Sequence, residues 1–222
     1  MLYRNEGRSI ERTANTSPCV LRVDKLRFAY PGRALWTDLA VGIPAGVSWV
    51  CGGDGCGKST LLRLLAGELG AQSGCFVLNG APVDPTHRAY RQRVFWTDMR
   101  SEAFEQITPL AYFATQRAHY PSWEEAAVRD LAEGFSLVPH LNKPIYMLST
   151  GSKRKVWLTA ALAAGADVTL IDDPFSALDK PSIQFFKAQL SAFVHAATRA
   201  CVMADYDAPG DVPLISRIDL PD

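Results

Sequence analysis

A glycine-rich segment between two apolar runs constrains this chain more than any other feature. Residues 47–51 read VSWVC, residues 52–59 read GGDGCGKS, and leucines dominate residues 61–65. This order predicts a buried strand, a loop, and a helix that begins at Lys58. Residues 52–59 also fit the phosphate-loop pattern G-x-x-x-x-G-K-[ST] in full. The fold is therefore expected to be organised around a strand–loop–helix unit that binds an anion.

The chemistry of this loop points to a nucleotide. Its glycines allow successive backbone N–H groups to point at one anion, and the helix behind it adds the positive end of its dipole. Lys58 is expected to reach the β- and γ-phosphates, and Ser59 to hold a magnesium ion. A tight strand-to-helix turn with an exposed lysine is the alternative, and the complete motif in its strand–loop–helix context favours the nucleotide. The predicted loop residues that bind it are Gly52, Gly53, Asp54, Gly55, Cys56, Gly57, Lys58, Ser59 and Thr60.

Composition narrows the class of protein and its partners. The chain has 222 residues, 48% of them hydrophobic, which suits one large α/β domain with a substantial core. Lys and Arg total 23 and so do Asp and Glu, so the formal net charge is zero. Binding to nucleic acid through overall charge is therefore not expected.

The N-terminal segment, the longest apolar tract and the cysteines bear on where in the cell the protein is expected. Residues 1–18 are predicted to be a flexible arm, and their polar character argues against a secretory leader. The longest apolar tract, residues 156–171, is interrupted and too short to span a bilayer. The five cysteines are scattered without metal-binding spacing, which suits a reducing cytosol. Any role at a membrane is therefore expected to come through a partner.

Hydrophobic periodicity gives the order of elements. Strands are predicted over 19–30, as one strand or two with a bend, and over 35–43, 47–51, 75–78, 93–96, 168–172 and 200–204, with one or two more near the C-terminus. Helices are predicted from 58, from 109, from a capped start at 121–125 to 135, over 152–164 and over 183–197. This alternation implies a parallel sheet with helices on its faces, an antiparallel β part, and a helical insert near 100–156.

Further motifs stand in a fixed order around the phosphate loop. Asp172 closes a buried strand, where a carboxylate beside the loop can order magnesium together with Ser59. The other motifs are Tyr30 at the end of the first strand, the run Leu148-Ser149-Thr150-Gly151-Ser152 at a helix start, and Ser176-Ala177-Leu178-Asp179 after Asp172. From about Cys19 onward, the chain thereby resembles the nucleotide-binding subunit of an ATP-binding cassette (ABC) transporter.

The resemblance implies a fold and a set of roles. It implies an α/β P-loop NTPase over residues 19–222, with a RecA-like parallel core, an antiparallel β subdomain and an inserted helical subdomain at about 100–156. It implies that Tyr30 stacks on adenine, and that Ser149 and Gly151 reach across a head-to-tail dimer to the ATP of a second subunit. ATP and Mg²⁺ are the implied ligands, and an integral-membrane permease is the implied partner. The protein would then be cytoplasmic and peripheral to the inner face of the cell membrane.

Departures from the family pattern fall on the hydrolytic machinery. Asp173 stands where the family usually has the glutamate that activates water, and a shorter side chain withdraws the carboxylate. Asp205 stands where a switch histidine is expected after the strand 200–204. Residues 97–100 read TDMR where the family places a glutamine. With Lys58, Asp173 and Asp205 as the catalytic candidates, we expect ATP to bind normally and hydrolysis to be slow.

The sequence is also compatible with functions other than transport. A non-transporting ATP-dependent regulatory switch, or the degenerate half of a heterodimer, would also tolerate these departures. A P-loop kinase or GTPase would have no use for the stretch 149–152. Within transporters, residues 173–179 resemble small exporter-type cassettes such as the haem-export subunit of cytochrome c maturation, whereas residues 120–124 are similar to a segment of multidrug-export cassettes. The sequence leaves the substrate open, as well as the choice between a homodimer and a heterodimer.

Overall fold

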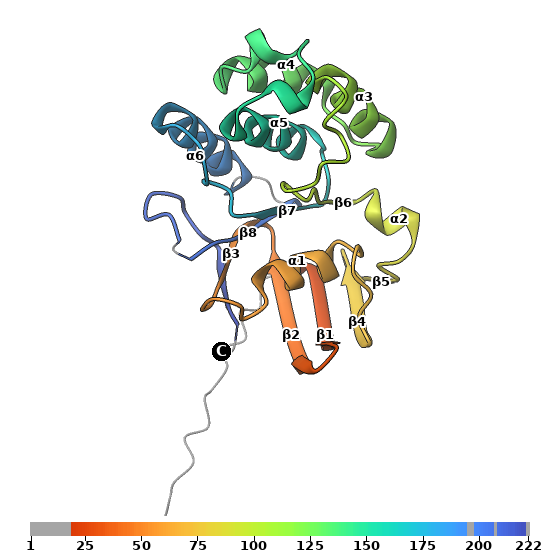
Figure 1. Cartoon of the computed structure of the whole chain (residues 1–222). Helices are drawn as coiled ribbons and strands as arrows, with labels where there is room; N and C mark the ends of the chain where they lie inside the picture. Colours follow the sequence, from red (N-terminus) through yellow and green to blue (C-terminus); the bar gives the residue numbers. More distant parts are fainter. Residues whose placement is uncertain (1–18, 195–197, 207, 221–222) are drawn as a thin grey trace, which may run out of the picture.

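Two β-sheets and two groups of helices build the molecule (Figure 1). The computed structural model describes residues 19–194, 198–206 and 208–220. The predicted arm, residues 1–18, lies outside the described residues. In the part of the chain that is described, no helix is long and apolar enough to cross a membrane.

The larger sheet is parallel and carries the strand that precedes the phosphate loop. Its order is β6 (Val94–Phe95), β7 (Val168–Asp172), β8 (Ala200–Ala204), β3 (Gly46–Cys51) and β9 (Ser216–Asp219). Every residue of β3 is buried, as expected of a strand covered on both faces of a parallel sheet. All five strands are therefore aligned with their carboxyl ends at one edge, where ligands bind in α/β folds.

The smaller sheet is antiparallel. Its order is β2 (Arg33–Pro44), β1 (Cys19–Tyr30), β4 (Ser73–Leu78) and β5 (Ala81–Val83). The expected bend in the first strand is accommodated within one continuous strand, because the pairing of β1 with β2 shifts register several times between Cys19 and Ala29. Such irregularities bend a strand without ending its pairing.

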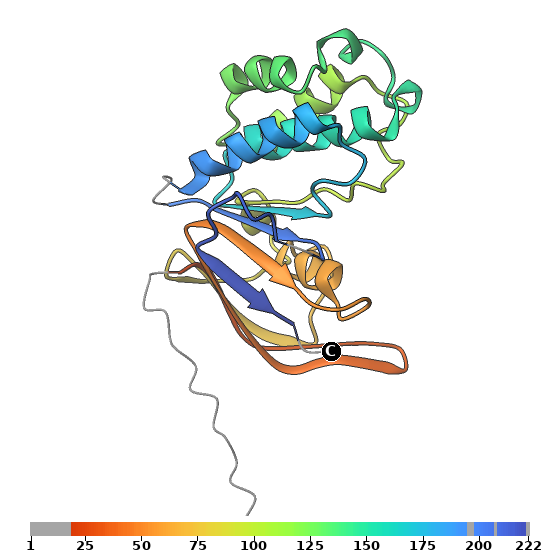
Figure 2. The same cartoon turned by 90° about the vertical axis from the view of Figure 1, so that its left-hand side faces the viewer.

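The helices divide between the two faces of the parallel sheet. Their bounds are α1 (Lys58–Leu65), α2 (Arg88–Arg91), α3 (Pro109–His119), α4 (Glu125–Gly134), α5 (Thr150–Ala163) and α6 (Lys180–Val194), with short 3₁₀ turns η1 (Val138–His140) and η2 (Ile145–Met147). Helices α3 to α6 lie on one side of the parallel sheet, and α1 with the antiparallel sheet lies on the other (Figures 1 and 2). The parallel sheet is therefore the middle layer.

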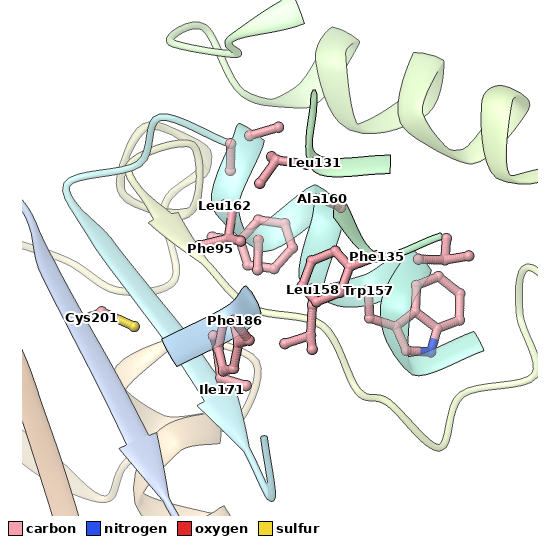
Figure 3. Packing of buried hydrophobic residues seen from close by; sticks show 14 of the residues in the cluster. Phe95, Leu131, Phe135, Trp157, Leu158, Ala160, Leu162, Ile171, Phe186 and Cys201 are labelled. Atoms are coloured by element: carbon pink, nitrogen blue, oxygen red, sulfur yellow. The ribbon is translucent and has the colours of Figure 1, made fainter. Parts of the chain in front are cut away.

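Two hydrophobic clusters follow from this layering. Alternate residues of β3 face opposite sides, so that Trp49 belongs to the cluster under α5 and Val50 to the cluster around α1. Helix α5 is buried at every position from Lys155 to Ala163. Figure 3 shows Leu158 of α5 packed in one cluster with Ile171 of β7 and Phe186 of α6. Helix α5 is thus fixed directly above the strand that ends in Asp172.

The start of α4 differs from the sequence expectation. A capped start was expected around Pro121–Glu125, but Glu124 is the N-cap and no side chain caps the helix. The reason is tertiary: the N–H of Glu124 donates to the carbonyl of Ala163 at the end of α5 (2.8 Å), and its carboxylate pairs with Arg199 (2.8 Å). Packing against α5 therefore replaces the local cap.

Candidate nucleotide site

The phosphate loop connects β3 to α1 in the predicted strand–loop–helix arrangement. Gly57, the N-cap of α1, has φ +106°, a left-handed conformation that favours glycine. A Cβ at Gly57 would also lie 2.7 Å from the Trp36 ring on β2. Glycine is therefore required here both by the backbone turn and by the close approach of the antiparallel sheet.

Lys58 is held over the loop by atoms of its own chain. Its ammonium group donates to the carbonyl oxygens of Gly52 (2.8 Å) and Gly53 (2.9 Å). It also lies 4.7 Å from the centre of the Tyr206 ring, within the range of a cation–π contact. The positive charge is thereby placed above the loop amides, where a phosphate would bind.

A cavity of about 300 Å³ opens beside this loop. It gathers the loop with the ends of β7 and β8 at the carboxyl edge of the parallel sheet, the usual ligand position in such folds. It is lined by Asp54, Gly55, Gly57, Lys58, Ser59, Thr60, Arg100, Asp172, Asp173, Ala204, Asp205 and Tyr206. Of the other predicted loop residues, Gly52 and Gly53 contact Lys58 through their carbonyls, and Cys56 is buried in the core.

Asp172 and Ser59 meet in this cavity as the sequence predicts for a magnesium site. Asp172 accepts a hydrogen bond from the Ser59 side chain, which lowers the pKa of the carboxyl, but burial is the larger effect and raises that pKa overall. A carboxylate and a hydroxyl are ligands that Mg²⁺ accepts, with the rest of its octahedron completed by water and nucleotide phosphates. Among the described residues, no group of three or more acidic, His or Cys side chains is arranged so that it could hold a metal ion by itself. The donor set thus fits a magnesium ion that arrives with a nucleotide.

The raised pKa of Asp172 predicts that its ionised carboxylate lowers the stability of the fold while it supports binding of magnesium and nucleotide. A carboxyl whose pKa is higher in the folded than in the unfolded chain destabilises the fold once it is ionised, and this cost disappears as the pH falls through the raised pKa. We therefore expect Asp172→Asn to raise the melting temperature at neutral pH, and this gain to shrink toward about pH 4, where aspartates become protonated. Magnesium-dependent nucleotide affinity is expected to fall in the same variant.

Thermal melts of both proteins across this pH range measure the effect. The matched control is Asp38→Asn, which removes an exposed carboxylate on β2. A melting temperature for Asp172→Asn that is no higher than that of the wild type at neutral pH would contradict the prediction.

The two predicted catalytic carboxylates reach the cavity from neighbouring strands. Asp173 follows β7 directly and Asp205 follows β8, and both line the cavity. Asp173 is 45% exposed and lies 3.7 Å from the guanidinium of Arg154 on α5. The structure therefore brings Asp173 and Asp205 to the same cavity as Lys58.

Sequence reasoning missed Tyr206, the next residue after Asp205. The Tyr206 hydroxyl hydrogen-bonds to Asp54 in the phosphate loop, and its ring covers Lys58 although the side chain is 61% exposed. The hydrogen bond to Asp54 is the main cause that raises the pKa of Tyr206. The side chain that extends over the loop is therefore Tyr206, and Asp205 is the residue beside it.

Arg100 was also given no role from the sequence. It lies in the segment where a glutamine was expected, and it lines the cavity with Ser59 and Asp172. Its charge lowers the pKa of Asp172, against the effect of burial. The segment in which the family has a glutamine therefore contributes a cation to the cavity. In the sequence, the only sign of this role was that Arg100 lies in that segment and is positively charged.

Tyr30 lies beside the loop but outside the cavity described above. Its hydroxyl is 3.2 Å from Oγ1 of Thr60, its ring contacts Phe28 edge-on, and it is 39% exposed. Three residues further on, Arg33 donates to the carbonyl of Gly55 (2.9 Å). The tip of the β1–β2 hairpin is thus bonded to the phosphate loop, with an aromatic ring partly open to solvent.

Ser149 and Gly151 do not line this cavity. Ser149 is the N-cap of α5 and accepts a hydrogen bond from the N–H of Ser152 (3.2 Å). A Cβ at Gly151 would collide with the carbonyl of Ala177. In the same region, Asp179 accepts hydrogen bonds from Lys155 (2.7 Å) and from the N–H of Ser182 (2.9 Å), with the Lys155 contact the main cause that lowers its pKa to about 2. The start of α5 and the segment around Asp179 therefore do not line the nucleotide cavity.

Comparison with known proteins agrees with this geometry. The family model described as "ABC transporter" matches residues 38–176, more than half of the chain. The chain is 30% identical to a cytochrome c biogenesis ATP-binding export protein CcmA of Idiomarina loihiensis, over 78% of this chain and 79% of that protein. It is 32% identical to a zinc transport system ATP-binding protein TroB of Treponema pallidum, over 74% of this chain and 64% of that protein.

Solved structures agree on the fold. The structure of an ATP-binding subunit of an ABC transporter superimposes with a TM-score of 0.76 at 21% identity, and covers 84% of this chain and 79% of that chain. The predicted fold class is confirmed: a P-loop NTPase with a parallel core, an antiparallel sheet and added helices. The chain belongs to the ABC transporter family, as one of its ATP-binding subunits.

Proposed function

We propose that this subunit binds MgATP in the cavity beside the phosphate loop, pairs head-to-tail with a second ATP-binding subunit, and drives a membrane permease with slow hydrolysis. One observation carries the proposal: Lys58, Ser59 and Asp172 meet in one cavity of about 300 Å³. Ser59 and Asp172 would hold Mg²⁺, which would supply positive charge between the phosphates. The loop amides and Lys58 bind and orient the triphosphate.

Slow hydrolysis is supported by the side chains around the terminal phosphate position. We propose Asp173 as the residue that activates water, and its side chain is one methylene shorter than that of glutamate, which withdraws the carboxylate from the terminal phosphate. Asp205 adds a negative charge where a hydrogen-bond donor to the phosphate would help. Four carboxylates line one small cavity, and three of them (Asp172, Asp173 and Asp205) stand at the ends of β7 and β8. We infer that the site is better suited to holding ATP than to cleaving it quickly.

Pairing of two subunits is supported by the exposed start of α5. Ser149 is exposed at this helix N-terminus and lies outside the nucleotide cavity of its own subunit, so this helix start is open to the phosphates of another subunit. Head-to-tail pairing would place this helix start against the triphosphate held by the other subunit. Either a second copy or a related subunit could fill that position.

The names of the relatives bear on the transport partner. Relatives named for cytochrome c biogenesis export match over 76% to 87% of their own length, whereas the relative named for zinc transport matches over 64%. We propose that the chain serves an export permease of the cytochrome c biogenesis type, at the cytoplasmic face of the cell membrane. The slow-switch alternative predicts no permease at all, so the partner separates the two functions.

The decisive experiment measures ATP binding and ATP hydrolysis on the same purified sample, with and without the permease. Tight MgATP binding with slow turnover that the permease accelerates is the expected result. Binding without acceleration by any co-purified membrane protein would favour the regulatory switch. Absence of ATP binding would reject the proposal.

A gain-of-function variant tests the reason given for slow turnover. Replacing Asp173→Glu and Asp205→His together restores a longer carboxylate and a donor, and is expected to raise the hydrolysis rate by roughly 100-fold, the scale of a 1 Å correction at a reacting group. Steady-state phosphate release by the purified dimer is the measurement. The single variants serve as controls, and an unchanged rate in the double variant would contradict this explanation.

A further inference from the structure

Arg154 is a buried cation in the N-terminal half of α5 that the nucleotide site as described does not require. Its side chain is only 11% exposed. Its guanidinium donates to the backbone carbonyls of Asp172 and Asp173, contacts the sulfur of Met99 (3.0 Å), and pairs with the Asp173 carboxylate (3.7 Å). One side chain therefore reaches both the backbone and the carboxylate of the residue assigned to activate water.

The backbone at Asp173 needs such support. Asp173 has φ +50°, in the left-handed region that residues with a Cβ rarely adopt. Its N–H donates to the carbonyl of Ala204 on β8 (2.8 Å), and its own carbonyl accepts from Arg154. The peptide is thus held from the sheet on one side and from α5 on the other. Loss of the Arg154 contact would leave the conformation fixed from the sheet side alone.

Neighbouring residues show how specific this contact is. Three consecutive basic residues of α5 each pair with a different acidic partner: Lys153 with Glu105 (2.5 Å), Arg154 with Asp173, and Lys155 with Asp179 (2.7 Å). Successive side chains on a helix point about 100° apart, so each reaches a different segment. Arg154 alone among the three contacts a residue that lines the nucleotide cavity.

A buried guanidinium is kept at a cost. Burial lowers the pKa of Arg154, and the Asp173 carboxylate partly reverses this effect. A charge removed from water is tolerated when partners satisfy it, and here these partners are two carbonyls and one carboxylate of the same loop. An apolar side chain of similar length could fill the space but could not hold the carboxylate.

We propose that Arg154 is a positioning residue for hydrolysis: it holds the Asp173 carboxylate and peptide on the wall of the nucleotide cavity. The proposal rests on the function proposed above, in which Asp173 activates water. It adds a link between sites, because the N-cap of α5 is Ser149, the residue proposed to contact the second subunit. Movement of α5 when the subunits pair would therefore move Arg154 relative to Asp173.

The test compares Arg154→Gln with Arg154→Lys. With nucleotide affinity within a few-fold of wild type, Arg154→Gln is expected to slow single-turnover hydrolysis by about 10- to 100-fold, the scale of a misplaced catalytic group. Arg154→Lys keeps the charge and is expected to recover part of that loss. Lys153→Gln, which breaks the neighbouring pair with Glu105, is the matched control and is expected to hydrolyse at the wild-type rate.

A double-variant comparison separates positioning from a general structural effect. In an Asp173→Asn background there is no carboxylate to position, so adding Arg154→Gln should slow hydrolysis little further. A further loss as large as that in the wild-type background, or a wild-type rate for Arg154→Gln alone, would overturn the proposal.

Hydrogen–deuterium exchange gives a readout that does not depend on turnover. The Asp173 amide, bonded to Ala204, should exchange faster in Arg154→Gln than in wild type or in Lys153→Gln, and equal exchange would overturn the proposal even if turnover were too slow to follow. Should Arg154→Gln fail to fold, the same comparison is made with Arg154→Lys, in which the Asp173 amide is expected to exchange faster than in wild type. A wild-type protein that does not bind ATP would reject the proposed function, whereas normal binding with unchanged Asp173 exchange would reject only the role of Arg154.

Discussion

Replacing Lys58 by alanine is expected to weaken ATP binding by roughly 100-fold. Hydrogen bonds that involve a charged group contribute about 1.5–3 kcal/mol each, and every 1.4 kcal/mol is a factor of ten in affinity. Lys58 would supply more than one such bond to the β- and γ-phosphates from its position above the loop. Isothermal titration with MgATP measures the loss directly.

The control for this variant is a lysine that has no place in the site. Lys143 is exposed and does not line the cavity, so Lys143→Ala should bind MgATP as the wild type does. Equal affinities for Lys58→Ala and wild type would remove the basis for the nucleotide site. Thermal melts of both variants would show that any loss is not due to unfolding.

Replacing Ser149 by aspartate is expected to abolish ATP-driven pairing while ATP still binds to each subunit. Aspartate is as good an N-cap as serine, so α5 should keep its start. Its negative charge would, however, face the triphosphate of the second subunit. Loss of a charged hydrogen bond at each of two symmetric positions weakens the dimer by about 100-fold or more, before repulsion is added.

Ser149→Asn provides the matched control for pairing. Asparagine has nearly the shape of aspartate, also caps helices, and carries no charge. Sedimentation with ATP and Mg²⁺ should therefore show dimers for Ser149→Asn and monomers for Ser149→Asp. If the aspartate variant pairs as readily as the asparagine variant, the start of α5 does not contact the phosphates of a second subunit.

The central part of the fold could be predicted from the sequence because its signals are local. The apolar run before the phosphate loop, the glycines and the leucines after it are contiguous, and the structure has β3, the loop and α1 at those positions. The parallel core likewise follows from buried apolar runs such as Val168–Asp172. The prediction of an α/β P-loop fold is confirmed by structures of related ATP-binding subunits.

Short elements and helix starts could not be predicted in the same way. Strand β5 has three residues and α2 has four, too few to show a hydrophobic period. Cys75 lies in an apolar run of the sequence, yet it is exposed on β4. These features depend on which neighbour covers each segment, and that information is absent from a local pattern.

The same limit applies to the site. The loop residues and Asp172 were proposed from contiguous motifs, whereas Tyr206 and Arg154 are brought to the site by contacts with other segments of the chain. Two adjacent residues, Asp205 and Tyr206, follow β8, and no periodicity in a loop indicates which one turns toward the phosphate loop. The choice is made by the hydrogen bond to Asp54, which only the folded chain reveals.

The surroundings of Lys58 have a consequence for ligand choice. Its charge already interacts with two carbonyls of its own loop and with the face of the Tyr206 ring. An arriving anion exchanges these partners for its own oxygens, so its net gain is smaller than the bare charge suggests. A small anion with few oxygens gains least from this exchange, and a ligand that engages the amides, the ammonium and the metal ligands together gains most. Because one cation is already shared in this way, we expect the site to bind inorganic phosphate weakly and extended polyphosphates much more tightly.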